Sequence, residues 1–145
     1  MILISKSEKE TREFGEKLAK KISPPSIICL YGDLGGGKTT FVKGLAKGLK
    51  IKEKITSPTF IILRKYRGKK GKKSINFYHI DLYRTKEFEL SNLGVEEILN
   101  EPNSIIAIEW AEKIKKFLPK KRIEIEFKFI DENTRKIIIK NVSLN

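Results

Sequence analysis

One glycine-rich segment dominates the sequence: Gly32-Asp33-Leu34-Gly35-Gly36-Gly37-Lys38-Thr39. Two glycines separated by four residues and followed by Lys and Thr are typical of a phosphate-binding loop. The glycines let backbone amides turn toward one anion, Lys38 can reach the β- and γ-phosphates, and the Thr39 hydroxyl can ligate Mg²⁺. The apolar run Ile27–Tyr31 before the segment indicates a buried strand, and Phe41, Leu45 and Leu49 recur after it at helical spacing. This strand, loop and helix predict a nucleotide-binding site.

The composition limits the other classes of protein. The 145 residues suit one domain, residues 1–145, with no room for an inserted substrate domain. No signal peptide or membrane-length apolar run is present, and the single cysteine, Cys29, excludes internal disulfides, so we expect a cytoplasmic protein. The net charge of +13 suggests nucleic acid, but it comes from lysines scattered along the chain, which favours a soluble surface over a sequence reader. A non-specific electrostatic contact with nucleic acid remains an alternative.

The order of the remaining elements predicts the fold class. Ser7 and Glu10 have the spacing of a capping box, which starts a helix that ends before Pro24. We expect further strands at Met1–Ile4, Phe60–Tyr66, Ser74–Ile80, Ser104–Ile108, Arg122–Ile130 and Arg135–Val142. We expect short helices at Glu87–Asn92, Val95–Leu99 and Ala111–Phe117. This order predicts a three-layer α/β domain of the P-loop NTPase type. Its sheet should be mostly parallel, with antiparallel additions and a C-terminal β-hairpin.

Two segments allow more specific predictions. The basic segment Arg67–Lys73 contains two glycines and is interpreted as a hairpin tip, for which a solvated loop is favoured over contact with phosphates. The segment Arg122–Ile130 alternates apolar and charged residues, which predicts a half-solvated antiparallel strand rather than a covered parallel one.

Hydrolysis needs carboxylates near the loop, and two candidates end apolar runs. Glu109 follows Ser104–Ile108 and Asp81 follows Phe77–Ile80, where the carboxyl ends of strands would face the phosphates. His79 is the single histidine, for which packing or hydrogen bonding is favoured over proton transfer. Trp110 could lie in the core or against the nucleotide. The chain has no Asn-Lys-x-Asp motif, the motif that recognises guanine, so we expect ATP rather than GTP.

Four segments in order resemble the TsaE (YjeE) family. They are Gly32 to Phe41, Ser57-Pro58-Thr59-Phe60, His79-Ile80-Asp81-Leu82-Tyr83-Arg84 and Glu109-Trp110. The resemblance spans most of the chain, and one departure is Gly36, where the family usually has Ala. It implies a cytoplasmic ATPase that binds ATP with Mg²⁺ and assembles with TsaB and TsaD. The complex would install the carbamoyl group on the adenosine beside the anticodon of ANN-decoding tRNAs.

The same resemblance implies roles for single residues. Gly35, Gly36, Gly37, Lys38, Thr39 and Thr40 would wrap the phosphates. Thr39 and Glu109 would ligate Mg²⁺, Asp81 would act near the γ-phosphate, and Trp110 would neighbour the site. Ser57, Pro58 and Thr59 would form a switch-like segment, with Thr11 near the adenine and Glu8 one turn before it. His79, Tyr83 and Arg84 support the motif.

Two alternative functions share the phosphate-binding loop. A small-molecule kinase would need an acceptor pocket and an Arg-bearing lid, for which six arginines and no lid-sized insert leave little room. A nucleotide-binding adaptor with negligible turnover would use the same residues as an ATPase, so only kinetics separates the two.

Overall fold

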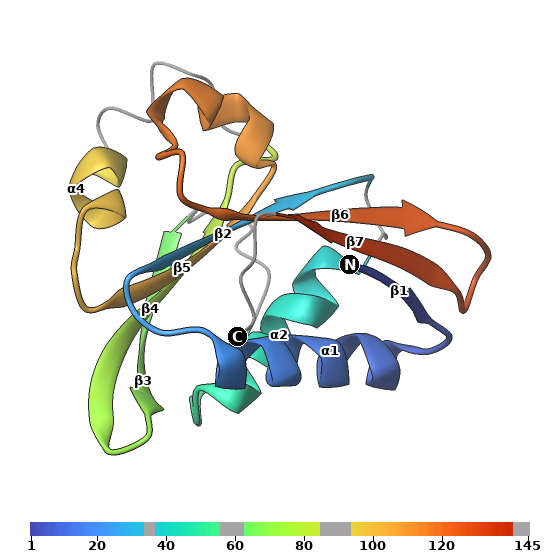
Figure 1. The fold of residues 1–145 in the computed structure, drawn as a ribbon, viewed down its shortest axis with the longest axis horizontal. Helices are drawn as coiled ribbons and strands as arrows, with labels where there is room; N and C mark the ends of the chain where they lie inside the picture. Colours follow the sequence, from blue (N-terminus) through green and yellow to red (C-terminus); the bar gives the residue numbers. More distant parts are fainter. Residues whose placement is uncertain (34–36, 56–62, 85–93, 141–145) are drawn as a thin grey trace.

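A computed structural model of the chain describes residues 1–33, 37–55, 63–84 and 94–140. These residues form one sheet of seven strands with helices on both faces (Figure 1). The strands are β1 (Ile2–Ser5), β2 (Ser26–Tyr31), β3 (Leu63–Lys70), β4 (Lys73–Asp81), β5 (Ser104–Glu109), β6 (Ile123–Phe129) and β7 (Arg135–Lys140). The helices are α1 (Glu8–Lys21), α2 (Lys38–Gly48), α4 (Val95–Leu99) and the 3₁₀ helix η2 (Ala111–Phe117).

The sheet is mixed, so the prediction of a mostly parallel sheet is wrong. The strand order is β1-β7-β6-β2-β5-β4-β3. The pairs β6–β2, β2–β5 and β5–β4 are parallel, whereas β1–β7, β7–β6 and β4–β3 are antiparallel. The prediction of a C-terminal β-hairpin, formed by β6 and β7, is confirmed.

The prediction for Arg122–Ile130 is only half right. Strand β6 pairs antiparallel with β7 on one edge, but it also pairs parallel with β2 on the other. Its residues alternate between buried and partly exposed, as the sequence indicates. Alternation reports that one face of a strand is solvated, and it carries no information about the direction of the neighbouring strand.

Helices pack on the two faces of the sheet, which confirms the three-layer architecture (Figure 1). One core lies under α1 and α2 and includes Leu18, Phe41, Leu45, Phe77 and Ile125. The other lies under α4 and η2 and includes Ile80, Ile106, Ile108, Val95 and Ile114. In β4 and β5 the odd-numbered residues face α1 and α2, because side chains alternate along a strand.

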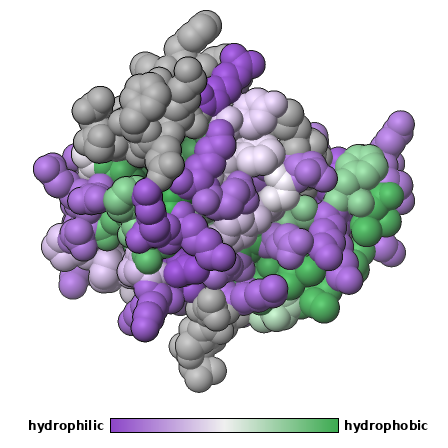
Figure 2. Space-filling model, turned by 90° about the horizontal axis from the view of Figure 1, so that it is seen from above, coloured by the Kyte–Doolittle hydropathy of each residue, from purple (hydrophilic) through white to green (hydrophobic). Residues whose placement is uncertain are grey.

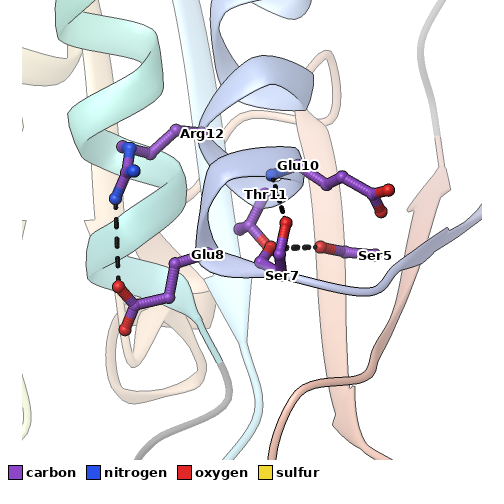
Figure 3. A network of polar contacts seen from close by, with 6 residues as sticks. All are labelled: Ser5, Ser7, Glu8, Glu10, Thr11 and Arg12. Carbon is purple, nitrogen blue, oxygen red and sulfur yellow. Dashed lines mark hydrogen bonds and ion pairs between the residues drawn. The ribbon is translucent and has the colours of Figure 1, made fainter.

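Helix α1 begins at the predicted cap. The Ser7 hydroxyl accepts a hydrogen bond from the Glu10 amide at 3.0 Å, and the Glu10 carboxylate accepts one from the Lys6 amide at 2.7 Å. Figure 3 shows these side chains gathered around the first turn. The first turn also carries the acidic residues Glu8 and Glu10. Their negative charges stabilise the helix, because the N-terminal end of the helix dipole is positive.

Three other predictions meet the structure differently. The prediction that Arg67–Lys73 forms a hairpin tip is confirmed, but the turn is short: β3 continues to Lys70, β4 begins at Lys73, and only Gly71 and Lys72 turn between them. Strand β3 is described from Leu63, so the first part of the predicted strand Phe60–Tyr66 lies outside the described residues, as does the predicted helix Glu87–Asn92. The helix expected at Ala111–Phe117 is present as a 3₁₀ helix.

The surface of the described residues is largely hydrophilic. Apolar residues are among those visible in Figure 2 at the end of the molecule formed by β1 and the β6–β7 turn, where Ile2, Ile4, Phe129 and Ile130 are exposed. No helix in the described part of the chain combines the length and the apolar character needed to cross a membrane.

Candidate functional site

The candidate site lies where β2, β4 and β5 end and α2 begins. Glu109 is the last residue of β5, and it is in register with Leu30 on β2 and with Asp81 on β4. Because these three strands are parallel, their carboxyl ends meet at one edge of the sheet. The two carboxylates and the glycine-rich segment therefore converge, as the sequence predicted.

Two glycines of the segment have conformations that other residues rarely adopt. Gly32 has a φ of 127°, and a Cβ on it would collide with the carbonyl oxygen of Phe127. Gly37 has a φ of 101° and precedes α2. Gly35 and Gly36 lie outside the described residues.

The first turn of α2 has no capping side chain among the described residues and carries no acidic residue. A helix begins with backbone N–H groups that lack partners inside the helix, and its dipole favours negative charge there. Such an end binds phosphate when nothing else completes it. Lys38, Thr39 and Thr40 form this turn of the helix.

Lys38 is buried beside the segment. Its ammonium donates to the carbonyl oxygen of Gly32 and, at 3.3 Å, to that of Asp33, and it lies 4.1 Å from the centre of the Trp110 ring. Burial lowers the pKa of Lys38, while the charges of Glu109, Glu112, Asp81 and Asp33 oppose that shift. The lysine thus lies among carboxylates, an arrangement that suits a bound anion poorly unless a cation accompanies it.

Thr39 connects α2 to the sheet. Its hydroxyl lies 3.2 Å from both carboxylate oxygens of Glu109. A hydroxyl and a carboxylate are hard oxygen ligands of the kind that Mg²⁺ prefers. No group of three or more His, Cys, Asp or Glu side chains in the described part of the chain could hold a metal ion. The pair therefore fits an ion that takes its other ligands from phosphate and water, as Mg²⁺ usually does.

His79 also contacts the Glu109 carboxylate. Its Nε2 lies 2.6 Å from Glu109 Oε2, and both side chains are buried. Its Nδ1 has no hydrogen-bond partner within the described ranges. His79 and Glu109 both occupy odd positions of neighbouring strands, so they face the same side as α2. The sequence favoured a packing or hydrogen-bonding role for this histidine but did not indicate its partner.

Asp81 ends β4 beside Glu109. Burial, and then the Glu109 charge, raise the pKa of Asp81, and its Oδ1 accepts a hydrogen bond from the Tyr83 amide at 3.1 Å. A half-buried carboxylate next to a second one suits a group that accepts a proton.

Trp110 adopts a left-handed conformation with a φ of 61°, which is uncommon for a large side chain. Its amide donates to Leu30 at 3.2 Å, and its ring packs against Tyr83 at 5.1 Å. The backbone turns sharply after Glu109, so that the carboxylate and the indole both lie near Lys38. Strained residues of this kind cluster at functional sites.

The residues implied on the adenine side lie on the first turn of α1 (Figure 3). Thr11 is buried, and its hydroxyl lies 2.6 Å from that of Ser5. A Cβ on Gly37 would lie 3.6 Å from the Thr11 methyl group, so this turn adjoins the segment. Glu8 points outward toward Arg12, at 3.9 Å. Thr11 therefore neighbours the start of α2, whereas Glu8 faces solvent.

The remaining predicted residues divide into two groups. Ser57, Pro58 and Thr59 lie outside the described residues, and Arg84 is exposed.

Glu112 of η2 is an acid that sequence reasoning missed: burial raises the pKa of its carboxyl, and the Lys38 charge lowers it. Its position two residues after Trp110 offered no motif by which to find it.

Comparison with known proteins identifies the family. The family model described as "Threonylcarbamoyl adenosine biosynthesis protein TsaE" matches residues 5–137. The chain belongs to the TsaE family. A TsaE relative from Aquifex aeolicus is 41% identical over 139 residues, which cover 94% of this chain and 93% of that protein. A TsaE relative from Rickettsia typhi is 42% identical over 136 residues, covering 92% and 90%. Both are described as "tRNA threonylcarbamoyladenosine biosynthesis protein TsaE".

A solved structure supports the same assignment. The crystal structure of Bacillus subtilis YdiB superposes with a TM-score of 0.74 at 31% identity, covering 94% of this chain and 82% of that one. The fold of this chain is therefore shared with a solved protein. Membership of the TsaE family, predicted from the four sequence segments, is confirmed.

Proposed function

We propose that this TsaE-family chain is a cytoplasmic, Mg²⁺-dependent ATPase that acts with TsaB and TsaD to form threonylcarbamoyladenosine on ANN-decoding tRNAs. Family membership supports the pathway. The observation that carries the nucleotide site is the Thr39 hydroxyl shared by both oxygens of Glu109, at the head of a helix without a capping side chain and beside Lys38.

Each described residue has a chemical task in this proposal. The Lys38 ammonium and the first amides of α2 bind the phosphates. Thr39 and Glu109 hold Mg²⁺, which when bound neutralises charge on the phosphate oxygens. His79 fixes the orientation of Glu109 through its 2.6 Å contact. Asp81 orients the attacking water and accepts its proton as the bond between the γ-phosphorus and the ADP oxygen breaks.

Replacing Lys38 tests the site. Lys38→Ala removes the charge that meets the phosphates, so ATP binding measured by calorimetry in the presence of Mg²⁺ should be abolished. Lys43→Ala is the matched control, because Lys43 is an exposed lysine on the same helix. Unchanged ATP affinity in Lys38→Ala would remove the nucleotide site from the proposal.

Replacing Asp81 separates hydrolysis from binding. Asp81→Ala should retain ATP affinity but release phosphate at least about a hundredfold more slowly, because the proton acceptor is lost. Glu132→Ala, which removes an exposed carboxylate from the β6–β7 turn, is the control. We expect slow turnover by the isolated chain, so both variants are measured with the reconstituted partner proteins. Tight ATP binding without turnover in the complete unmutated system would favour the adaptor function instead.

A further inference from the structure

The β3–β4 hairpin concentrates positive charge. Between Leu63 and Ile80 the chain has seven lysines and arginines and no aspartate or glutamate. This hairpin therefore carries more than half of the formal net charge of +13. It lies at the end of the sheet opposite β1, with β3 as the edge strand (Figure 1).

Most of the segment Arg67–Lys73, predicted as a hairpin tip, belongs to the two paired strands. The antiparallel ladder continues to the pair Lys70–Lys73. Gly71, with a φ of 63°, and Lys72 make a two-residue turn, for which a positive φ at the first turn residue is required. The cations therefore have defined positions on a pleated surface.

Both long helices anchor the hairpin close to its turn. The Lys69 amide donates to the Leu49 carbonyl at 2.7 Å, just after α2. This approach needs Gly68, since a Cβ there would lie 2.8 Å from the same oxygen. The Lys70 ammonium donates to the carbonyl oxygens of Ala19 and Lys20, at 2.9 Å and 2.6 Å, at the end of α1. The hairpin is thus held in place before any ligand arrives.

The face of β3 turned away from α1 and α2 carries a row of cations. Tyr66 and Gly68 face the helices, so the alternating residues Lys65, Arg67 and Lys69 point to the other side, where all three are exposed. Successive members of the row are about 7 Å apart along the strand. No ion pair to these three side chains occurs in the described part of the chain.

Protection of the sheet edge does not account for the whole set. Lysines on an edge strand discourage pairing with another sheet, which would explain Lys65 and Lys69 on β3. It would not explain Lys72 in the turn or Lys73 on β4, which lie off the edge. An anchored, acid-free ribbon of cations is the arrangement that binds a polyanion.

We propose that the outer face of β3 and the turn at Gly71–Lys72 bind the phosphate backbone of a folded RNA. The choice of RNA rests on the proposed function, since the TsaE relatives are named for a tRNA modification. Lysines outnumber arginines on the hairpin, and lysine acts as a point charge rather than a bidentate reader. The contact is therefore with phosphates and holds the RNA without reading its sequence.

Two triple variants with the same loss of charge test this surface. The hairpin variant is Lys65→Gln, Lys69→Gln and Lys72→Gln, and the control is Lys17→Gln, Lys120→Gln and Lys121→Gln, all at exposed positions. Binding to an unmodified tRNA transcript is measured by fluorescence anisotropy over a range of salt concentrations. The hairpin variant should bind on the order of tenfold more weakly, with a logarithmic salt slope shallower by about 2 to 3, and the control should change far less.

Several results would overturn the proposal. These are equal losses in the two variants, no tRNA binding by the unmutated chain, and binding to phosphatidylserine vesicles in place of tRNA. Aggregation of the hairpin variant with unchanged tRNA affinity of its soluble fraction would identify the lysines as edge protection. ATP affinity is measured in parallel and should be unchanged in both triples, because none of the six lysines adjoins α2's first turn. Failure of ATP binding in the unmutated chain would refute the proposed function and leave the hairpin result standing.

Discussion

The two long helices on the same face of the sheet begin in opposite ways. The N-terminus of α1 is completed by residues within a few positions of it: Ser7 caps the Glu10 amide, and Ser5 pairs with Thr11. The N-terminus of α2 has neither a cap nor an acid in the described residues. Its Thr39 instead meets Glu109 of β5, seventy residues away, and His79 of the neighbouring strand β4 contacts the same carboxylate.

This difference distinguishes a helix end that the chain completes itself from the one that we propose binds a nucleotide. Orphan amide groups at a helix start must find partners. In α1 the chain supplies those partners itself, so no ligand is needed. In α2 the described chain leaves the amides uncapped and surrounds them with groups that suit a phosphate and its cation. The predictions below alter one end at a time.

The largest effect on stability is expected from His79. His79→Leu leaves the buried Glu109 carboxylate without its 2.6 Å partner, which should lower the free energy of unfolding by about 1–3 kcal/mol. His79→Gln keeps an N–H donor and should restore part of the loss. Thermal denaturation measures both. Tyr66→Phe is the control, since its buried hydroxyl has no partner in the described structure. An equal loss in the control would show that the Glu109 contact contributes nothing specific.

A smaller effect is expected at the locally completed helix. Ser7→Ala removes the cap of α1 and should lower the free energy of unfolding by about 1 kcal/mol, because the Glu10 amide loses its acceptor. ATP affinity should not change, since Ser7 completes α1 alone. Denaturant unfolding and calorimetry give the two values. A large loss of ATP affinity would show that the two helix ends are coupled through Thr11.

The smallest change in stability is expected from Thr40→Glu, which should stabilise the protein but weaken its binding of ATP. Thr40→Glu adds an acid to the first turn of α2, which should stabilise the ligand-free protein by about 0.3–1 kcal/mol through the helix dipole. The same charge should weaken ATP binding, because it repels phosphate. Thr40→Gln, which keeps the size without the charge, is the control. Tighter ATP binding by Thr40→Glu would contradict the assignment of this helix end to phosphate.

Local patterns were enough to predict much of the molecule. The Ser7 cap, strands β2 and β5, the helix after the glycine-rich segment and the β6–β7 hairpin all follow from periodicity and caps that involve residues close together in the chain. The convergence of Asp81 and Glu109 also follows, because parallel strands end at one edge. Family membership was evident from four short segments.

Other features could not be read from local patterns. The parallel pairing of β6 with β2, the continuation of β3 through Arg67 to Lys70 and the 3₁₀ form of η2 depend on neighbours distant in sequence. Glu112 carries no motif, and its place near Lys38 exists only in the folded chain. Alternation of apolar and charged residues predicts that one face of a strand is exposed to solvent, but it does not predict which strand pairs with it.

The sequence by itself determined the residue types on which the proposed phosphate and Mg²⁺ site depends, since glycine conformations, a lysine charge and a hydroxyl are properties of single residues and their immediate neighbours. Only the tertiary structure decided that His79 contacts Glu109, that the Trp110 ring lies against the Lys38 ammonium, and that the cations of β3 share one exposed face. Those arrangements need strand register and packing between distant segments, and hydrogen bonds between distant residues form only when the sheet brings their strands together.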